Sequence, residues 1–288
     1  MSAAQAQRKD AAPRVSTTPS TGRTFGVLLG HVVRLQARSA AIWGVLLGLS
    51  GVMMVSIFPA IADGPALEDS ADSMPPGFME AAGVEDLVSM GTITGFLQAE
   101  LFGLIVPLAL PFFAILAAAN AIAGAEENGT IDVLMGNPLP RWQLVASYFV
   151  ATAISLVGVL AIFGFFLWGS ALFIDAELSL GTTAEGVFGT WPLALFFGGL
   201  AMLCSAIFHR RILAIGVSGA VLFVMYFFNV VSGLVEDLEF LKNFSAIHHY
   251  GSPITDGIDW SSFAGLTGAA LLLAAVAVLA FQKRDIYT

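Results

Sequence analysis

The segment AGAEENGTIDVLMGNPLPRWQ occupies residues 123–143, between two long apolar runs of the chain. It contains four charged residues, which are Glu126, Glu127, Asp132 and Arg141. The flanking runs, 101–123 and 143–174, contain no Asp, Glu, Lys or Arg, and each is as long as the roughly 20 residues with which a helix crosses a bilayer, or longer. The sequence therefore predicts a short polar loop between two membrane-spanning helices.

The composition of the whole chain agrees with a membrane setting. Hydrophobic residues make up 57% of the sequence and charged residues only 11%, whereas soluble globular chains carry about 25% charged residues. Apolar runs of this length fit helices, which satisfy their own backbone polar groups in lipid. We therefore predict an all-α integral membrane protein with six transmembrane helices. The expected spans, each free of Asp, Glu, Lys and Arg, are 41–62, 101–123, 143–174, 186–208, 212–235 and 260–281.

The basic residues predict how the chain crosses the membrane, because Lys and Arg concentrate in cytoplasmic loops. If both termini are cytoplasmic, 11 of the 12 Lys and Arg residues face the cytosol, and Lys242 is the exception. The same topology leaves only 5 of the 21 acidic residues on that side. We therefore expect a multi-pass protein of the prokaryotic cytoplasmic membrane with both termini inside. The net charge of −9 then reflects the outer loops and gives no indication of nucleic-acid binding.

Two features precede the first span. Residues 1–22 lack an apolar core and predict a disordered cytoplasmic tail rather than a signal peptide. Residues 23–39, RTFGVLLGHVVRLQARS, place apolar residues on one helical face and His31, Arg34 and Arg38 on the other. A basic amphipathic helix of this kind lies in the membrane interface with its arginines toward lipid headgroups. A simple positive cluster that fixes topology is the alternative interpretation. Residues 40–288 are then the six-helix transmembrane domain.

The polar loop belongs to a longer run, ANAIAGAEENGTIDVLMGNPLPRWQLVASYF at 119–149, that resembles a signature of ABC-2 type transporter permeases. That signature places an acidic pair, a Gly-Thr, a leucine patch, a Pro and an Arg-Trp ahead of the third span. Two other places are similar to the family. AIHHY at 246–250 stands where the family has a Pro-Phe-His-Tyr core, although the proline is missing here. The chain end closes with an aromatic and a basic-basic-acidic cluster, which is Phe281, Lys283, Arg284 and Asp285.

The resemblance implies a six-helix permease with an ABC-2, type V exporter-like fold. In such systems a second permease copy, identical or related, completes the transport unit, and two cytoplasmic ATPase subunits bind ATP and Mg. The amphipathic helix before the first span acts as a connecting helix, and a short helix in the first cytoplasmic loop couples to the ATPase. The positions that would carry this coupling are Glu126, Glu127, Gly129, Thr130, Asp132, Leu134, Pro138 and Arg141. A loop that merely connects two helices is the alternative.

The sequence contains no phosphate-binding loop. Such a loop needs a lysine followed by Ser or Thr after a glycine-rich turn, whereas Lys9, Lys242 and Lys283 precede Asp, Asn and Arg. We therefore expect ATP hydrolysis in a separate subunit, and no catalytic residue, cofactor or metal site in this chain.

Two of the predicted spans contain residues that could line a transport path for a hydrophobic substrate. Pro107 and Pro111 fall on one face of the second span, where proline frees carbonyl groups and permits a kink. The outer half of the fifth span is rich in aromatic residues, and its candidate path residues are Phe223, Tyr226, Phe227 and Asn229. Ordinary packing and lipid contact are the alternative explanation. The lack of charge in the predicted spans favours an apolar or amphipathic substrate, such as a drug, lipid, peptide or natural product.

Other functional classes fit the sequence less well. His248 and His249 are adjacent, so their side chains would point about 100° apart on a helix, and no Cys or carboxylate cluster accompanies them. A membrane enzyme would need convergent acids or histidines, and an ion-coupled carrier usually keeps an ionisable residue at membrane depth. The predicted spans contain none. The sequence therefore favours the permease of an ATP-driven exporter, with a membrane enzyme or an ion-coupled carrier as the alternative.

Overall fold

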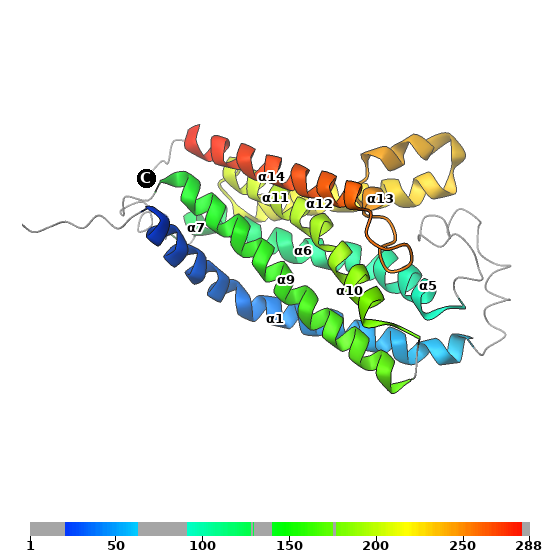
Figure 1. Ribbon diagram of the computed structural model, residues 1–288. Coiled ribbons are helices and arrows are strands. Elements are labelled where there is room, and N and C mark those ends of the chain that lie inside the picture. The colour runs from blue at the N-terminus through cyan, green and yellow to red at the C-terminus, as the bar shows by residue number, and fades with distance from the viewer. Residues whose placement is uncertain (1–20, 63–90, 128, 130–139, 175–176, 284–288) are drawn as a thin grey trace, which may run out of the picture.

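The computed structural model describes residues 21–62, 91–127, 129, 140–174 and 177–283. These residues form an elongated helical bundle, and none of them belongs to a β-strand (Figure 1). Six helical stretches are long and apolar enough to cross a membrane. They are Thr24–Ala60, Ile93–Ala119, Arg141–Phe173, Leu180–Ile207, Arg211–Leu234 and Trp260–Lys283. The prediction of an all-α protein with six transmembrane helices is therefore confirmed.

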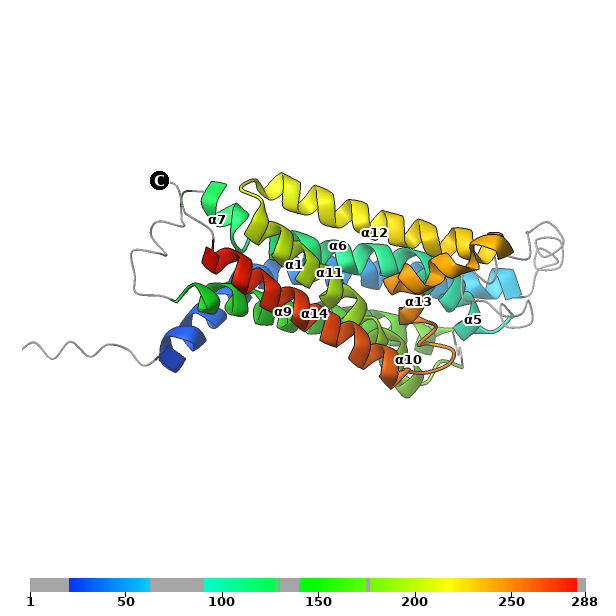
Figure 2. The same ribbon diagram turned by 90° about the horizontal axis from the view of Figure 1, so that it is seen from above.

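The first span is part of α1 (Thr21–Ala62), a single helix of 42 residues. At about 1.5 Å per residue it is about 63 Å long, which is twice the roughly 30 Å hydrocarbon core of a bilayer. The predicted connecting helix, 23–39, is thus continuous with the predicted span at 41–62. The first turns of α1 diverge from the rest of the bundle (Figure 2). Residues 1–20 of the predicted tail lie outside the described residues.

The second span begins eight residues before its predicted start, because α5 (Ile93–Leu97) leads without a break into η2 (Gln98–Ile105), a π-helix, and then into α6 (Val106–Ala119). Thr92 caps α5, since its Oγ1 accepts the backbone N–H of Gly95 at 3.1 Å. The helix of the second span therefore includes half-buried Glu100, in η2, which directly precedes the charge-free range 101–123. The predicted span starts after this glutamate because the prediction rests on a window without charged residues.

The third span, α9 (Arg141–Phe173), has 33 residues and confirms the predicted long helix. The fourth span has two parts, α10 (Leu180–Gly189) and α11 (Trp191–Ile207), which meet at Thr190. Its predicted start at 186 is too late. Ser179 caps α10 by accepting the backbone N–H of Thr182 at 3.0 Å, so the helix begins before the exposed Glu185 that ended the charge-free window.

The last two spans, α12 (Arg211–Leu234) and α14 (Trp260–Lys283), agree with their predicted ranges. Between them lie η3 (Glu236–Phe244), a 3-10 helix, and the short α13 (Ala246–Tyr250). Asp259 caps α14, since its carboxylate accepts hydrogen bonds from the hydroxyls of Ser261 and Ser262, both at 2.7 Å. These hydrogen bonds lower the pKa of Asp259 to about 2.

Three helix contacts organise the bundle. α1 runs along α9, where a Cβ added to Gly44 would lie 2.8 Å from Cβ of Ile162, so only glycine permits this approach. Buried Gln36 adds a polar link to the same contact. Its Nε2 donates to Oγ1 of Thr152 at 3.3 Å, and its Oε1 accepts from the hydroxyl of Ser155 at 2.9 Å. α11 packs against α6 and α14 in the interior.

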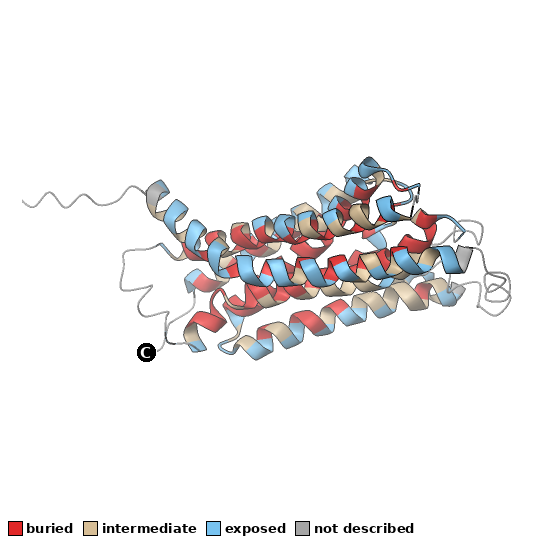
Figure 3. Ribbon diagram, turned by 90° about the horizontal axis from the view of Figure 1, so that it is seen from below, coloured by how far each residue is buried: buried red, intermediate tan, exposed pale blue. Residues whose placement is uncertain are grey.

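Burial follows this arrangement (Figure 3). Side chains between the helices are buried, whereas the outward faces of the bundle carry exposed large apolar residues, as expected for surfaces that meet lipid or another apolar partner. On α12 these include Phe223 and Phe227, which are 59% and 63% exposed.

Candidate functional site

The short helix α7 (Ala123–Glu127) follows the second span and begins the loop that the sequence singles out. It lies at the same end of the bundle as the starts of α1 and α9 and the end of α14 (Figure 1), and it contacts α11 and α12. We call this end the α7 end. The chain leaves the helical path of α6 at residues 120–122, where Nδ2 of Asn120 donates to the carbonyl of Leu116 at 2.9 Å.

The buried hydroxyl of Ser205 forms hydrogen bonds with the backbone at this break between α6 and α7. Oγ of Ser205, on α11, accepts the backbone N–H groups of Ile122 at 3.3 Å and Ala123 at 3.0 Å. The same hydroxyl donates to the carbonyl of Ala119 at 3.2 Å. The end of α6 and the start of α7 leave backbone groups without helical partners, and Ser205 satisfies three of them. The position of α7 is therefore fixed by α11.

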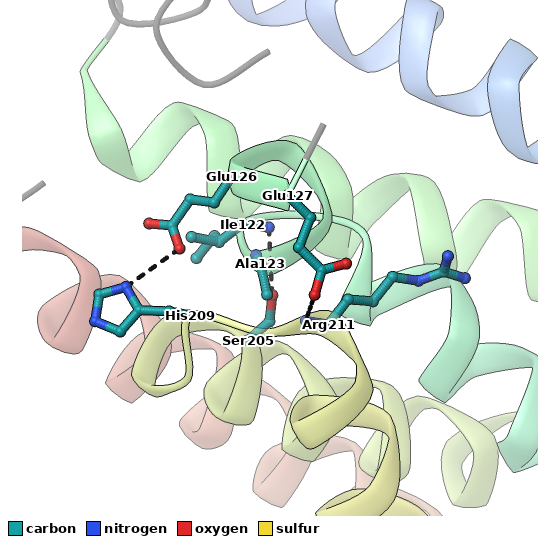
Figure 4. Close-up of polar contacts among 7 residues, drawn as sticks. All are labelled: Ile122, Ala123, Glu126, Glu127, Ser205, His209 and Arg211. Carbon is teal, nitrogen blue, oxygen red and sulfur yellow. Dashed lines mark hydrogen bonds and ion pairs between the residues drawn. The ribbon is translucent and has the colours of Figure 1, made fainter. Parts of the chain in front are cut away.

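The acidic pair of α7 contacts the turn between α11 and α12 (Figure 4). Glu126 Oε2 lies 3.5 Å from Nδ1 of His209, and Glu127 Oε1 accepts the backbone N–H of Arg211 at 2.8 Å. Arg211 is the first residue of α12, so Glu127 caps that helix. A carboxylate at an exposed helix N-terminus contributes about 0.3–1 kcal/mol. We call this set of residues the α7 junction: Ile122, Ala123, Glu126, Glu127, Ser205, His209 and Arg211.

Arg141 makes a second connection at the same end. As the first residue of α9, it donates through Nη1 to the carbonyls of Phe281 at 3.1 Å and Gln282 at 3.3 Å. Its guanidinium carbon also lies 5.5 Å from the ring centroid of Phe281. A cation suits the C-terminus of a helix, where carbonyls lack helical partners. Arg141 therefore joins the start of α9 to the end of α14.

The remaining residues of the predicted coupling segment are described only in part. Gly129 has φ of 63°, and its N–H donates to the carbonyl of Glu126 at 3.0 Å, so it ends α7 in a conformation that favours glycine. Thr130, Asp132, Leu134 and Pro138 lie outside the described residues. Their predicted role in binding an ATPase stays a prediction, as does that of the described members.

The predicted substrate-path residues do not gather at one place. Pro107 and Pro111 are buried within α6. Phe223 and Phe227 point outward from α12, whereas Tyr226 and Asn229 are half-buried. Met225 of the same helix lines a cavity of about 470 Å³ at the opposite end from α7, together with Asn243, His249 and Ser262. The role of these residues in a path stays a prediction.

Sequence reasoning missed Ser205, Arg211 and Gln98. A lone Ser in an apolar helix gives little signal, and in the sequence Arg211 is informative only as a positive charge that indicates topology.

Gln98 is 2% exposed, and its Oε1 has no hydrogen-bond partner. His249 Nε2 lies 3.2 Å from the carbonyl of Asn243. The described residues hold no group of three His, Cys, Asp or Glu side chains that could bind a metal ion.

The architecture defines the class of protein first. Six membrane-length helices make the chain a multi-pass all-α membrane protein. A family model described as ABC-2 family transporter protein matches residues 45–286, so the chain belongs to the ABC-2 family of transmembrane transport subunits. The match runs from within α1 to three residues beyond Lys283, the last residue of α14. No curated protein matches the chain.

Proposed function

We propose that this chain is the permease subunit of an ATP-driven exporter, and that a separate cytoplasmic ATPase subunit binds at the α7 end. The observation that carries the proposal is the set of contacts that α7 makes with the membrane spans. This helix is covalently continuous with α6, hydrogen-bonded to α11 through Ser205, and linked to the start of α12 through Glu127. A force applied to α7 would therefore displace three spans together.

The two connections at the α7 end suggest which spans would move together when a force acts on the coupling segment. The α7 junction joins α6, α11 and α12, and α14 packs against α11, whereas α1 packs along α9. Arg141 is the polar contact between the two groups, because it joins the start of α9 to the end of α14. The predicted coupling segment leads from the first group to the second along the chain. Closure of an ATPase against this segment would then move one group of spans relative to the other, which is what alternate opening of a transport path requires.

The remaining parts of the proposal follow from the sequence. Both termini lie in the cytosol of a prokaryotic cell, because that topology places 11 of the 12 Lys and Arg residues inside. A second permease copy, identical or related, completes the transport unit. ATP and Mg bind in the ATPase subunit. The cargo is apolar or amphipathic, such as a drug, lipid or peptide. It moves outward past the predicted path residues, which are Pro107 and Pro111 on α6 and Phe223, Tyr226, Phe227 and Asn229 on α12.

Variants of the coupling segment test the proposal by co-purification with the co-expressed ATPase and by ATP hydrolysis and transport assays. We expect Glu127→Arg and Leu134→Asp to insert normally but to lose the complex, or to abolish transport while ATP hydrolysis continues. In the proposed complex, Glu127 meets a basic group of the ATPase. Losing one partner of such a desolvated charge pair costs about 2–5 kcal/mol, or at least 30-fold in affinity. Glu177→Arg is the matched control, because Glu177 is an exposed residue beyond the other end of α9.

Glu127→Gln separates coupling from folding, because its amide oxygen can still accept the N–H of Arg211. If both coupling variants assemble and transport like the wild type, the segment is only a connector and the proposal is wrong.

Glu100 supports an ion-coupled carrier as the second candidate. This glutamate lies within the second span, in the π-helix η2, and ionisable residues at membrane depth often bind transported ions. If a protonophore stops transport while ATP is maintained, and Glu100→Gln has the same effect, the carrier is favoured over the exporter.

A further inference from the structure

A second cavity, of about 440 Å³, lies at the α7 end between α1, α6, α7, α9 and α12. Its volume is within the range of about 300–1,000 Å³ typical of small-molecule sites. Apolar side chains, among them Leu35, Phe113 and Leu116, form much of its wall, and Tyr148 and Arg211 contribute polar groups. The cavity is therefore amphipathic, and Arg211 is the charged residue among those that line it.

The guanidinium of Arg211 is not used within the part of the chain that the structure describes. It makes no ion pair there, and its Nε is buried without a hydrogen-bond partner. The contact with Glu127 uses the backbone N–H of Arg211 and leaves the side chain available. Figure 4 shows the guanidinium pointing away from the carboxylates of Glu126 and Glu127.

The two side-chain amides that line the cavity, those of Asn120 and Gln36, already have partners. Asn120 donates to the carbonyl of Leu116, and Gln36 is hydrogen-bonded to Thr152 and Ser155 on α9. A buried donor without a partner costs about 1–3 kcal/mol, and more when it is charged. An anion in the cavity would remove this cost, because a guanidinium donates two parallel hydrogen bonds to a phosphate or carboxylate.

The depth of the cavity indicates the kind of anion. Arg211 begins α12, and Asn120 follows the last residue of α6, so the charge lies where the spans leave the hydrocarbon. Lipid headgroups occupy this level. Arg34 and Arg38, both exposed on α1, add positive charge near this end, and such clusters attract anionic lipids.

We infer that this cavity binds an anionic phospholipid, with the phosphate on Arg211 and an acyl chain along Leu35, Phe113 and Leu116. Under the predicted topology the lipid comes from the cytoplasmic leaflet. It would fill the space between the α1–α9 pair and α6, next to the α7 junction. The inference goes beyond the proposed function and does not depend on an ATPase, so it can be tested with the permease alone.

The test is native mass spectrometry of the purified full-length protein, titrated with phosphatidylglycerol or with phosphatidylcholine. Phosphatidylglycerol should bind more tightly than phosphatidylcholine, whose quaternary ammonium offsets the phosphate charge. Arg211→Gln should weaken phosphatidylglycerol binding at least tenfold and phosphatidylcholine binding less. Arg210→Gln is the matched control, because Arg210 is the exposed neighbour and carries the same charge. It should change binding less than twofold. Arg211→Lys should restore part of the affinity, which shows that the charge and not a folding defect is responsible.

Three results would overturn the inference. Equal losses in Arg210→Gln and Arg211→Gln would indicate unspecific attraction to surface charge. Unchanged binding in Arg211→Gln would show that the lipid does not bind at this residue. Displacement of phosphatidylglycerol by an equal concentration of inorganic phosphate would show that the site binds a free anion rather than a lipid.

Discussion

Substitution Ser205→Ala tests whether α7 is seated on α11 as described. The Ser205 side chain is fully buried, and its hydroxyl makes three hydrogen bonds with backbone groups of Ala119, Ile122 and Ala123. Alanine removes one oxygen and little volume, so the main effect is to leave two N–H groups and one carbonyl without this partner. Each buried polar group left unsatisfied costs about 1–3 kcal/mol.

The expected loss is about 2–4 kcal/mol of unfolding free energy, because water that enters from the nearby bundle end can satisfy part of the need. The assay is reversible unfolding in mixed micelles, with the far-UV circular dichroism of the helices as the signal. Ser170→Ala is the control. The Ser170 hydroxyl only donates to the carbonyl of Leu167 in its own helix, at 2.8 Å, so this variant should lose less than about 1 kcal/mol.

A loss in Ser205→Ala no larger than that in Ser170→Ala would refute the reasoning. It would mean that the break between α6 and α7 is satisfied without Ser205, and that α7 can move independently of α11.

Three further predictions concern other parts of the bundle. Arg141→Gln should lower the thermal unfolding temperature and raise hydrogen exchange at the end of α14, because Phe281 loses its charged partner; unchanged exchange there would contradict this contact. Asp259→Ala should destabilise the protein at pH 5, and the difference from wild type should shrink as the pH falls from about 4 toward 2, because the folded-state pKa of about 2 is below the ordinary 3.8 and its stabilisation is lost on protonation. A constant difference across this pH range would refute the cap. Gly44→Val should reduce the yield of folded protein, because its Cβ would lie 2.8 Å from that of Ile162; a normal yield and melting temperature would show that α1 shifts easily against α9.

The number of spans could be predicted from the sequence because charge-free apolar runs of membrane length have few other solutions. Their boundaries were less accurate. A charge-free window ends at Glu100 and at Glu185, yet each of these residues lies inside a helix that begins at a hydroxyl cap, Thr92 or Ser179. Caps are decided by local hydrogen bonds that a hydrophobicity window ignores.

The residues of the candidate site could be singled out from the sequence, but their contacts within the chain could not. The acidic pair and Arg141 stood out as polar residues between apolar runs, and the family resemblance gave them an interpretation. Their partners within the chain, the loop at His209 and the end of α14, lie some 80 to 140 residues away. No local pattern indicates such pairs. In the sequence, Arg211 resembles any other basic residue of a cytoplasmic loop. Only the packing of the surrounding helices places its side chain at a cavity.

The most direct test of the central claim is photo-crosslinking in membranes that contain the permease and its co-expressed ATPase subunit. A photoreactive phenylalanine analogue replaces Leu134 in the coupling segment, or Glu177 as the control beyond the other end of α9. The account predicts a crosslinked product of permease and ATPase from position 134 and none from position 177. Its yield should change when ATP is trapped in the complex. No product from position 134, or equal products from both positions, would contradict the claim that this segment receives the ATPase.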